Sequence, residues 1–179
     1  MTDIITRHHT ALDGKESFAI YSPCEKYRYV LERRWGSGEK TLVMIMLNPS
    51  TATELQNDPT VERCERRARM WGFDKMHVLN IFAYRATDPQ DMRSIPDPVG
   101  ELNDEYIAAA LQLAKVSGDA HQVVCGWGTH GAHLQRGEQV LEMVAAYGIE
   151  PQALKWTSSG HPGHPLYIGY KEAPKVRVA

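Results

Sequence analysis

The sequence predicts an α/β fold: a three-layer α/β/α arrangement with a central, mostly parallel four-stranded sheet, preceded by an N-terminal β-hairpin. Short continuous apolar runs, typical of strands buried on both faces, alternate with segments of helical spacing. Glycine, proline and other turn residues separate these segments, as they separate strands from helices. The 179 residues, 42% of them hydrophobic, suit a single domain over 1–179 with one sizeable core.

The elements follow in order along the chain. The hairpin is predicted from two alternating, tyrosine-containing stretches, 17–21 and 27–35. The four buried strands are predicted at 41–47, 77–83, 122–128 and 153–157. Helices are predicted at 60–71, 103–115 and 137–147, with a Pro-rich connection at 88–98 and a loop at 158–165. Asp58 followed by Pro59 supports the first helix, because Asp is a good N-cap and Pro suits the first helical position.

Bulk properties limit the class of protein. The net charge of −2 argues against a protein that coats DNA without selectivity, although it is compatible with a local basic face. The three cysteines are widely spaced and odd in number, so they indicate no disulfide framework, and we expect a cytoplasmic protein. Residues 1–15 hold no apolar segment of the signal-peptide kind, and no apolar run approaches the roughly 20 residues that span a bilayer.

Polar and small residues follow each of the four predicted strands. The segments after the strands begin at Asn48 and continue at 83–87, 126–131 and 158–164. In a parallel sheet with helical connections the carboxyl ends of the strands lie at one edge, and ligands bind there. We therefore expect the functional site at this edge.

Three stretches at this edge resemble motifs of the uracil-DNA glycosylase superfamily. Residues 47–50, Leu-Asn-Pro-Ser, resemble the first motif, in which an Asp-Pro or Asn-Pro segment ends the first strand. Residues 78–82 resemble the strand whose Asn reads the base, and residues 159–162, Ser-Gly-His-Pro, resemble the His-Pro loop that closes on DNA. The chain is also similar to a bacterial and phage family catalogued as a domain of unknown function within or near this superfamily.

The resemblance implies a monofunctional DNA glycosylase, which flips a base out of the DNA and hydrolyses its N-glycosidic bond. Asn48 would hold the attacking water at the sugar carbon C1′, because an amide positions water but is not a strong base. His161 would donate a hydrogen bond to the leaving base as a neutral, preorganised donor. Asn80 would read the base edge. The implied enzyme needs no cofactor and its partner is DNA; the sequence indicates neither a membrane segment nor an obligate protein partner.

The substrate implied by the motif is a modified base. Strict uracil enzymes carry a bulky Tyr-His pair after the Asp-Pro segment, whereas small residues, Ser50, Thr51 and Ala52, stand here. A roomier pocket suits a larger base. Hypermodified bases of phage DNA are one candidate, and excising them would make this an antiviral defence protein.

Further residues near the strand ends are candidates for the same site. Asp58 is a secondary catalytic candidate, a carboxylate near Asn48. Substrate contacts are predicted for Ser50, Tyr84 and Trp127, the aromatic rings as stacking partners. DNA contacts are predicted for Arg85, Lys155, His164 and Leu166, with Leu166 as an apolar wedge between bases.

Structural roles compete with each of these assignments. Asn48 suits a turn or helix cap, and Asp58 suits a helix N-cap. Asn80 also fits a buried Asn bonded to the backbone, Trp127 a core residue, and His161 an ordinary loop residue. Four arginines between residues 63 and 69 suit either phosphate binding or a solvated face paired with acids one helical turn away.

Two other classes of function stay open. One is a binder of nucleotides or nucleic acid that keeps the fold without catalysis, since a fold does not determine a function. The other is a hydrolase of free nucleosides or nucleotides, which the acidic net charge favours. We expect no metal site: His130 and His133, like His161 and His164, are three residues apart, but glycines intervene and no carboxylate accompanies them.

Overall fold

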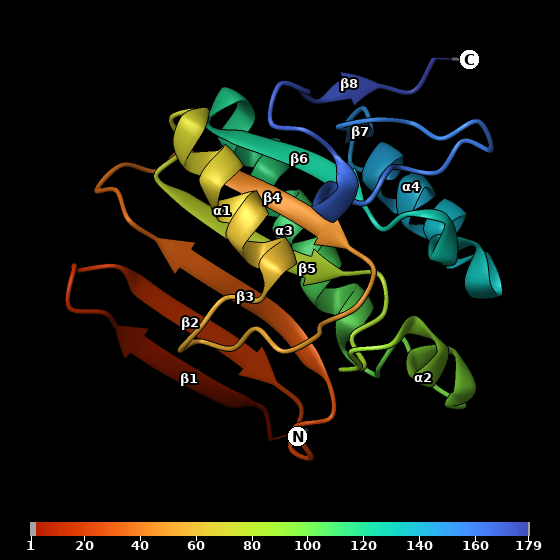
Figure 1. The fold of residues 1–179 in the computed structure, drawn as a ribbon, viewed down its shortest axis with the longest axis horizontal. Coiled ribbons are helices and arrows are strands. Elements are labelled where there is room, and N and C mark those ends of the chain that lie inside the picture. The colour runs from red at the N-terminus through yellow and green to blue at the C-terminus, as the bar shows by residue number, and fades with distance from the viewer. Residues whose placement is uncertain (1–2, 179) are drawn as a thin grey trace.

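A computed structural model describes residues 3–178 and contains an eight-stranded mixed sheet with helices on both faces (Figure 1). The strands are β1 (Ile5–Thr10), β2 (Glu16–Tyr21), β3 (Arg28–Arg34), β4 (Thr41–Met46), β5 (Lys75–Asn80), β6 (His121–Gly126), β7 (Gln152–Ala153) and β8 (Lys175–Val176). The α-helices are α1 (Pro59–Met70), α2 (Pro89–Ser94), α3 (Asn103–Ser117) and α4 (Arg136–Ala146). Three 3-10 segments complete the described elements: η1 (Gly118–Ala120), η2 (Thr129–Gln135) and η3 (Pro165–Tyr167).

The strand order is β1-β2-β3-β5-β4-β6-β7-β8. β4 pairs in parallel with β5 and β6, and β6 pairs in parallel with β7. β3 pairs antiparallel with β5, with Leu31 opposite Val78, and so joins β1 and β2 to the same sheet. The sheet is therefore larger than the four strands predicted. The hairpin is not separate from it, because β3 pairs with β2 on one edge and with β5 on the other.

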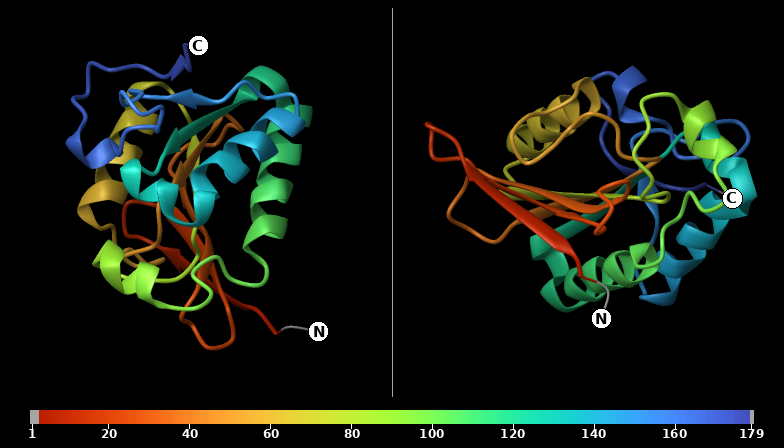
Figure 2. Two further views of the ribbon diagram at one scale, coloured as in Figure 1. Left: turned by 90° about the vertical axis from the view of Figure 1, so that its right-hand side faces the viewer. Right: turned by 90° about the horizontal axis from the view of Figure 1, so that it is seen from below.

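The side chains of β4 alternate between the two faces of the sheet, and this explains why helices cover both faces. Its side chains point in turn to two apolar clusters, so every residue of the strand is buried. One cluster joins Leu42 and Met44 to α1, and the other joins Val43 and Ile45 to α3 and α4. Two further views show α1 on one side of the sheet and α3 on the other (Figure 2).

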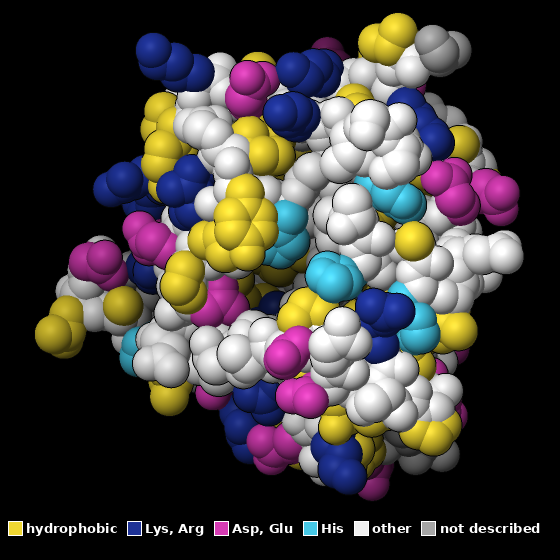
Figure 3. Space-filling model, turned by 45° about the vertical axis from the view of Figure 1, so that its right-hand side comes forward, with side chains coloured by type: hydrophobic (Ala, Val, Ile, Leu, Met, Phe, Trp, Pro, Cys, Tyr) yellow, Lys and Arg dark blue, Asp and Glu magenta, His cyan; other side chains and the backbone are white. Residues whose placement is uncertain are grey.

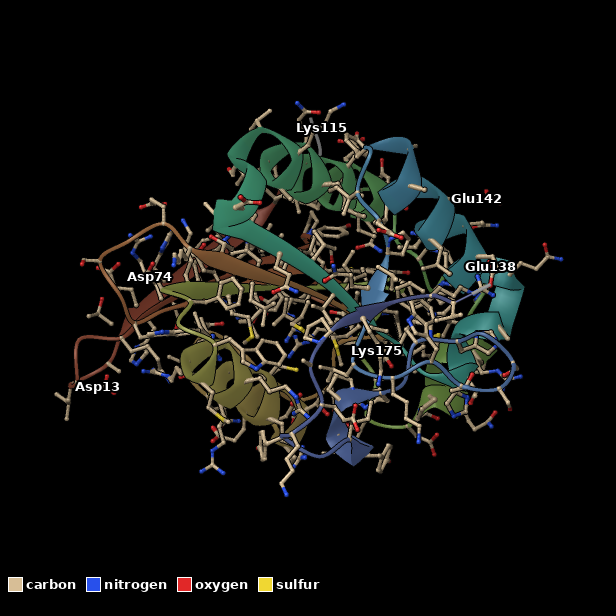
Figure 4. All side chains as sticks on the ribbon, turned by 90° about the horizontal axis from the view of Figure 1, so that it is seen from above. Asp13, Asp74, Lys115, Glu138, Glu142 and Lys175 are labelled. Carbon is tan, nitrogen blue, oxygen red and sulfur yellow. The ribbon has the colours of Figure 1, made fainter. Side chains whose placement is uncertain are left out.

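Side chains fill the space between the sheet and the helices on both sides, as the view from above shows (Figure 4). Charged residues such as Lys115 on α3 and Glu142 on α4 point outward in the same view. Within residues 3–178, none of the helices has the length and apolar character that crossing a membrane requires.

Two segments differ from the prediction for local reasons. Residues 88–98, expected as a connection, contain α2, which begins after Asp88 because that carboxylate accepts from the Gln90 N–H at 2.8 Å. The strand expected at 153–157 is only Gln152–Ala153, because Thr157 turns the chain back. The Thr157 N–H donates to the His161 carbonyl at 2.8 Å and closes the turn.

The topology places a crevice between β4 and β6. The chain leaves β4 for β5 on one side and returns to β6 on the other, so the connections diverge at this point of the sheet. Ligands of open α/β sheets bind outside the carboxyl ends of the strands at such a point.

Candidate active site at the carboxyl edge of the sheet

A cavity of about 580 Å³ opens where the two connections diverge. Its size lies within the range of small-molecule pockets, roughly 300–1,000 Å³. Its polar and aromatic lining includes Arg28, Asn48, Ser50, Thr51, Asp58, Asn80, Trp127, Thr129, His130, Thr157, His164 and Tyr167. Figure 3 shows histidine side chains gathered on a hollowed face of the molecule.

Asn48 lies two residues after the end of β4 and lines this cavity. Its Nδ2 donates to the Ala86 carbonyl at 2.8 Å and to the Pro49 carbonyl at 3.0 Å. These two bonds fix the orientation of the amide, with its nitrogen towards the two backbone carbonyls. Since no residue within 3–178 donates to Oδ1, this oxygen is left to accept a hydrogen bond from a ligand or water.

Asn80 ends β5 and is 2% exposed, yet its side chain lines the cavity. Arg28 Nη2 donates to Asn80 Oδ1 at 3.4 Å, and Arg28 Nη1 donates to the Ala52 carbonyl at 2.7 Å. Because a guanidinium only donates, the atom of Asn80 that faces it is the oxygen. The Nδ2 group is then turned away from Arg28 and bonds to no described residue.

Arg28 is the one lining residue with a permanent positive charge in the described chain. It begins β3, and because β3 runs antiparallel to β5, its first residue lies at the carboxyl edge of the sheet. Burial lowers the pKa of Arg28 to about 10, so the group remains charged at neutral pH. No acid within residues 3–178 forms an ion pair with it, and its Nε has no hydrogen-bond partner there.

Asp58 is the acid that lines the cavity among the described residues. It is also the N-cap of α1, since Oδ1 accepts from the Val61 N–H at 2.8 Å. Oδ2 accepts from the Ala52 N–H at 3.4 Å. Each carboxylate oxygen has two lone pairs, so capping the helix leaves Asp58 able to accept another proton or hydrogen bond.

Two histidines of one loop are placed differently. His161, predicted to contact the leaving base, is not among the residues that line the cavity; its backbone N–H donates to Thr157 Oγ1 in the turn. His164 lines the cavity. The Leu166 N–H donates to His164 Nδ1 at 3.3 Å, so the ring proton of the neutral form belongs on Nε2. Burial lowers the pKa of His164, which favours that neutral form, although Asp58 opposes the shift.

The remaining predicted residues divide into two groups. Ser50, Trp127 and Leu166 line the cavity. Trp127 is also a core residue at 1% exposure, and its role as a stacking partner of the substrate stays a prediction. Tyr167 lines the same cavity and is 83% exposed.

Tyr84, Arg85 and Lys155 lie outside the cavity lining. The Tyr84 ring packs edge-on against Tyr27, with centroids 5.5 Å apart. Arg85 Nη1 donates to the Glu25 carbonyl at 3.1 Å, and its guanidinium lies over the Tyr21 ring. Lys155 is exposed. Two of the predicted contact residues are thus engaged in holding neighbouring loops.

Arginines of α1 hold the segment that carries His164. Arg67 is fully buried, and its Nη2 donates to the carbonyls of Ile168 and, at 2.9 Å, Gly169. Arg63 Nη2 donates to the Ile168 carbonyl at 2.7 Å. Both guanidinium groups also lie over the Tyr170 ring. These arginines of the row at 63–69 therefore do not form the solvated face that the sequence allowed.

Arg28 was not predicted from the sequence, because the site was expected to contain residues at the carboxyl ends of the parallel strands. The stretch that contains β3 was predicted as a hairpin strand, and nothing in its local pattern marks Arg28 at its start as a residue of the site. In the described part of the chain, no three His, Cys, Asp or Glu side chains gather as ligands of a metal ion.

One of three comparisons with known proteins found a relationship. A family model described as "Protein of unknown function (DUF1643)" matches residues 28–166, which run from Arg28 of the cavity to Leu166 of η3. No curated protein and no solved structure matches the chain in the corresponding searches. The family description names no activity and no relation to the glycosylases. Because the match spans most of the 179 residues, the chain belongs to this family, the proteins of unknown function termed DUF1643.

Proposed function

We propose that this protein is a DNA glycosylase that takes a flipped, modified base into the cavity and hydrolyses its N-glycosidic bond. The observation that carries the proposal is the convergence of Asn48, Asn80 and His164 on one cavity, from segments that follow or end three different strands. Two of these residues belong to stretches that resemble glycosylase motifs, and the third lies two residues beyond the His-Pro stretch.

In the proposed reaction, water attacks C1′ of the sugar while the bond from C1′ to the base nitrogen breaks. The bonding electrons leave with the base, and the products are the free base and an abasic sugar. Asn48 Oδ1 accepts a hydrogen bond from the water and orients it, because its Nδ2 is held by backbone carbonyls. Asp58, which faces the same cavity, takes the proton that the water loses.

His164 replaces His161 in our proposal as the donor to the leaving base. A neutral imidazole with its proton on Nε2 is a fixed donor, and fixed donors aimed at developing negative charge stabilise a transition state. Ser50 and Thr51 line the cavity beside Asn48, and these small side chains leave room for a base that carries a substituent. Hypermodified phage DNA is the substrate we propose, with antiviral defence as the role.

The proposal is tested by scoring abasic sites after incubation with hypermodified phage DNA and, separately, with a uracil-containing duplex. We expect abasic sites in the modified DNA, with their formation reduced about 10²–10³-fold by Asn48→Ala and retained by Asn57→Ala. Asn57 is a matched control, because its amide bonds to Arg33 and Glu65 and lies outside the cavity. Activity on uracil alone would refute the modified base, and folded protein without activity on either DNA would refute the glycosylase.

One observation favours a second candidate, a hydrolase of free nucleosides. Arg63, Arg67 and Arg85 all donate to backbone carbonyls of this chain, so fewer cations remain free to bind the phosphates of DNA. Release of free base from nucleosides, without abasic sites in any DNA, would establish this candidate in place of the glycosylase.

A further inference from the structure

The contact between Arg28 and Asn80 determines which chemical groups the cavity accepts. Asn80 on its own is ambiguous, because its amide both donates and accepts and can turn over. Arg28 removes the ambiguity, since it has no acceptor and holds Oδ1 at 3.4 Å from Nη2. Asn80 therefore presents its N–H₂ to the cavity, where no described residue accepts from it.

The charge of Arg28 adds a second constraint. The side chain is 2% exposed, and no acid of the described chain forms an ion pair with it. The charged or ionisable groups around it are Tyr21 and Asp58, which favour its charge, and Arg33 and Arg85, which oppose it. A buried cation without an ion-pair partner destabilises the fold unless another group meets its charge. The open space next to it is the cavity.

We propose that Arg28 and Asn80 form an acceptor-selective wall, on which the bound base places a carbonyl oxygen and gains negative charge as it leaves the sugar. This inference rests on the proposed function, because it concerns the same cavity and the same bond cleavage. The electron pair of the broken bond stays on the base. Arg28 stabilises that charge through space and through the amide that it polarises, since hydrogen bonds to charged groups are stronger than those between neutral ones.

Arg28 is thus a positioning and charge-bearing residue, and the substrate class is a base with an oxo group on the edge that meets Asn80. Bases that present an amino group there place two donors face to face and bind poorly. Selectivity of this kind is strong, because a mismatch leaves buried polar groups unpaired.

The test uses free bases as probes, so it does not depend on turnover. Uracil, 5-fluorouracil and 5-nitrouracil share the same oxo edge and differ in the acidity of their N–H groups. We measure their dissociation constants by calorimetry at neutral pH. The wild-type protein is expected to bind 5-nitrouracil about tenfold tighter than uracil, the step that one charge-assisted hydrogen bond provides.

Three variants separate the charge effect from folding and from probe size. Arg28→Met is expected to reduce the ratio of the two dissociation constants to below about threefold. Asn80→Asp removes the donor and adds negative charge, so it is expected to invert the preference. Arg33→Met is the matched control: Arg33 is a buried arginine of the same strand that lies outside the cavity, and this variant should keep the wild-type ratio.

A wild-type ratio near one overturns the inference, as does an unchanged ratio in Arg28→Met or the absence of binding by any of the bases. If Arg28→Met does not fold, Asn80→Asp provides the test. Tighter binding of uracil than of 5-nitrouracil by this variant supports the inference, and an unchanged preference overturns it. Failure of the proposed function has a different signature. If the protein binds 5-nitrouracil tighter than uracil but forms no abasic sites, the acceptor-selective wall stands and the proposed hydrolysis is refuted. If it forms abasic sites but binds the two bases equally, the hydrolysis stands and the wall is refuted.

Discussion

The cavity joins two regions that are built in different ways. The floor is defined as Arg28, Asn48 and Asn80. Arg28 and Asn80 belong to neighbouring strands, and Asn48 lies two residues after a third strand. The rim, defined as residues 163–167, lies between two strands of two residues each and contains only the 3-10 turn η3. Backbone ladders position the floor, whereas arginine side chains of α1 hold the segment that follows η3. The ladders of the sheet therefore fix the floor, whereas the rim depends on backbone bonds between loops and on arginine side chains of α1.

The largest effect is expected at the floor. Asn48→Ala removes the oxygen proposed to hold the water, so abasic-site formation should fall by about 10²–10³-fold, as when a fixed polar group of an active site is lost. The unfolding free energy should fall by only about 1–2 kcal/mol, the typical value of the lost hydrogen bonds. Activity in single turnover and denaturant unfolding give the two quantities. A loss of activity no greater than that of Asn57→Ala would remove Asn48 from the mechanism.

Gly131→Ala tests the Trp127 ring that lines the cavity between floor and rim. A Cβ at residue 131 would lie 2.1 Å from Trp127 Cδ1, so the indole must move. We expect the unfolding free energy to fall by about 1–3 kcal/mol, the usual cost of overpacking, with a shift in tryptophan fluorescence. Gly169→Ala is the control, because no atom lies within 4 Å of a Cβ there. Equal stability of the two variants would show that the ring relaxes without cost.

The third prediction separates rim from floor. Arg67→Met removes the buried donor to the Ile168 and Gly169 carbonyls. Amide hydrogen exchange should rise about tenfold for rim residues such as Tyr167, while β4 keeps its protection, because local opening follows local contacts. Arg69→Met is the control on the same helix, since Arg69 pairs with Glu65 at 2.8 Å and does not reach the rim. Faster exchange throughout β4 would mean that the rim is part of the same cooperative unit as the floor.

The same division explains how much the sequence could predict. Buried apolar runs and caps located β4, β5, β6, α1, α3 and α4, and with them the edge that carries Asn48 and Asn80. Arg28 was missed because its place depends on a non-local pairing, β3 against β5, which no local pattern of residues specifies. α2 was overlooked although Asp88 and Pro89 repeat the signal that Asp58 and Pro59 gave.

The rim shows the limit most clearly. His161 and His164 both stand in Gly-His-Pro tripeptides, and sequence alone gives no means of telling which one reaches the cavity. The choice depends on the turn closed between Thr157 and His161 and on the anchoring of the following residues by α1. Such side-chain bonds to backbone carbonyls, between residues about 100 positions apart, leave no periodic trace in a sequence.

The smallest predicted effect is a pH dependence that belongs to the rim. Burial lowers the pKa of His164 from its ordinary value of 6.5, so below pH 6.5 the unfolded chain binds more protons than the folded one. The contribution of His164 to stability is therefore complete above pH 6.5 and is lost as the pH falls towards its folded pKa. Arg28 of the floor has a pKa of about 10 and keeps its charge throughout this window.

Denaturant unfolding of wild type and His164→Asn between pH 8 and pH 5 measures this contribution. The stability difference between the two proteins should shrink on acidification. His121 has a pKa lowered by burial as well and lies at the opposite end of the sheet, so His121→Asn reports the same sign without touching the rim. The pH dependence of abasic-site formation should depend on His164 and not on His121. The activity of His121→Asn should therefore fall in acid as it does in wild type. If the stability difference for His164→Asn instead grows in acid, His164 is stabilised as a cation, and it is not the neutral donor that the proposed reaction requires.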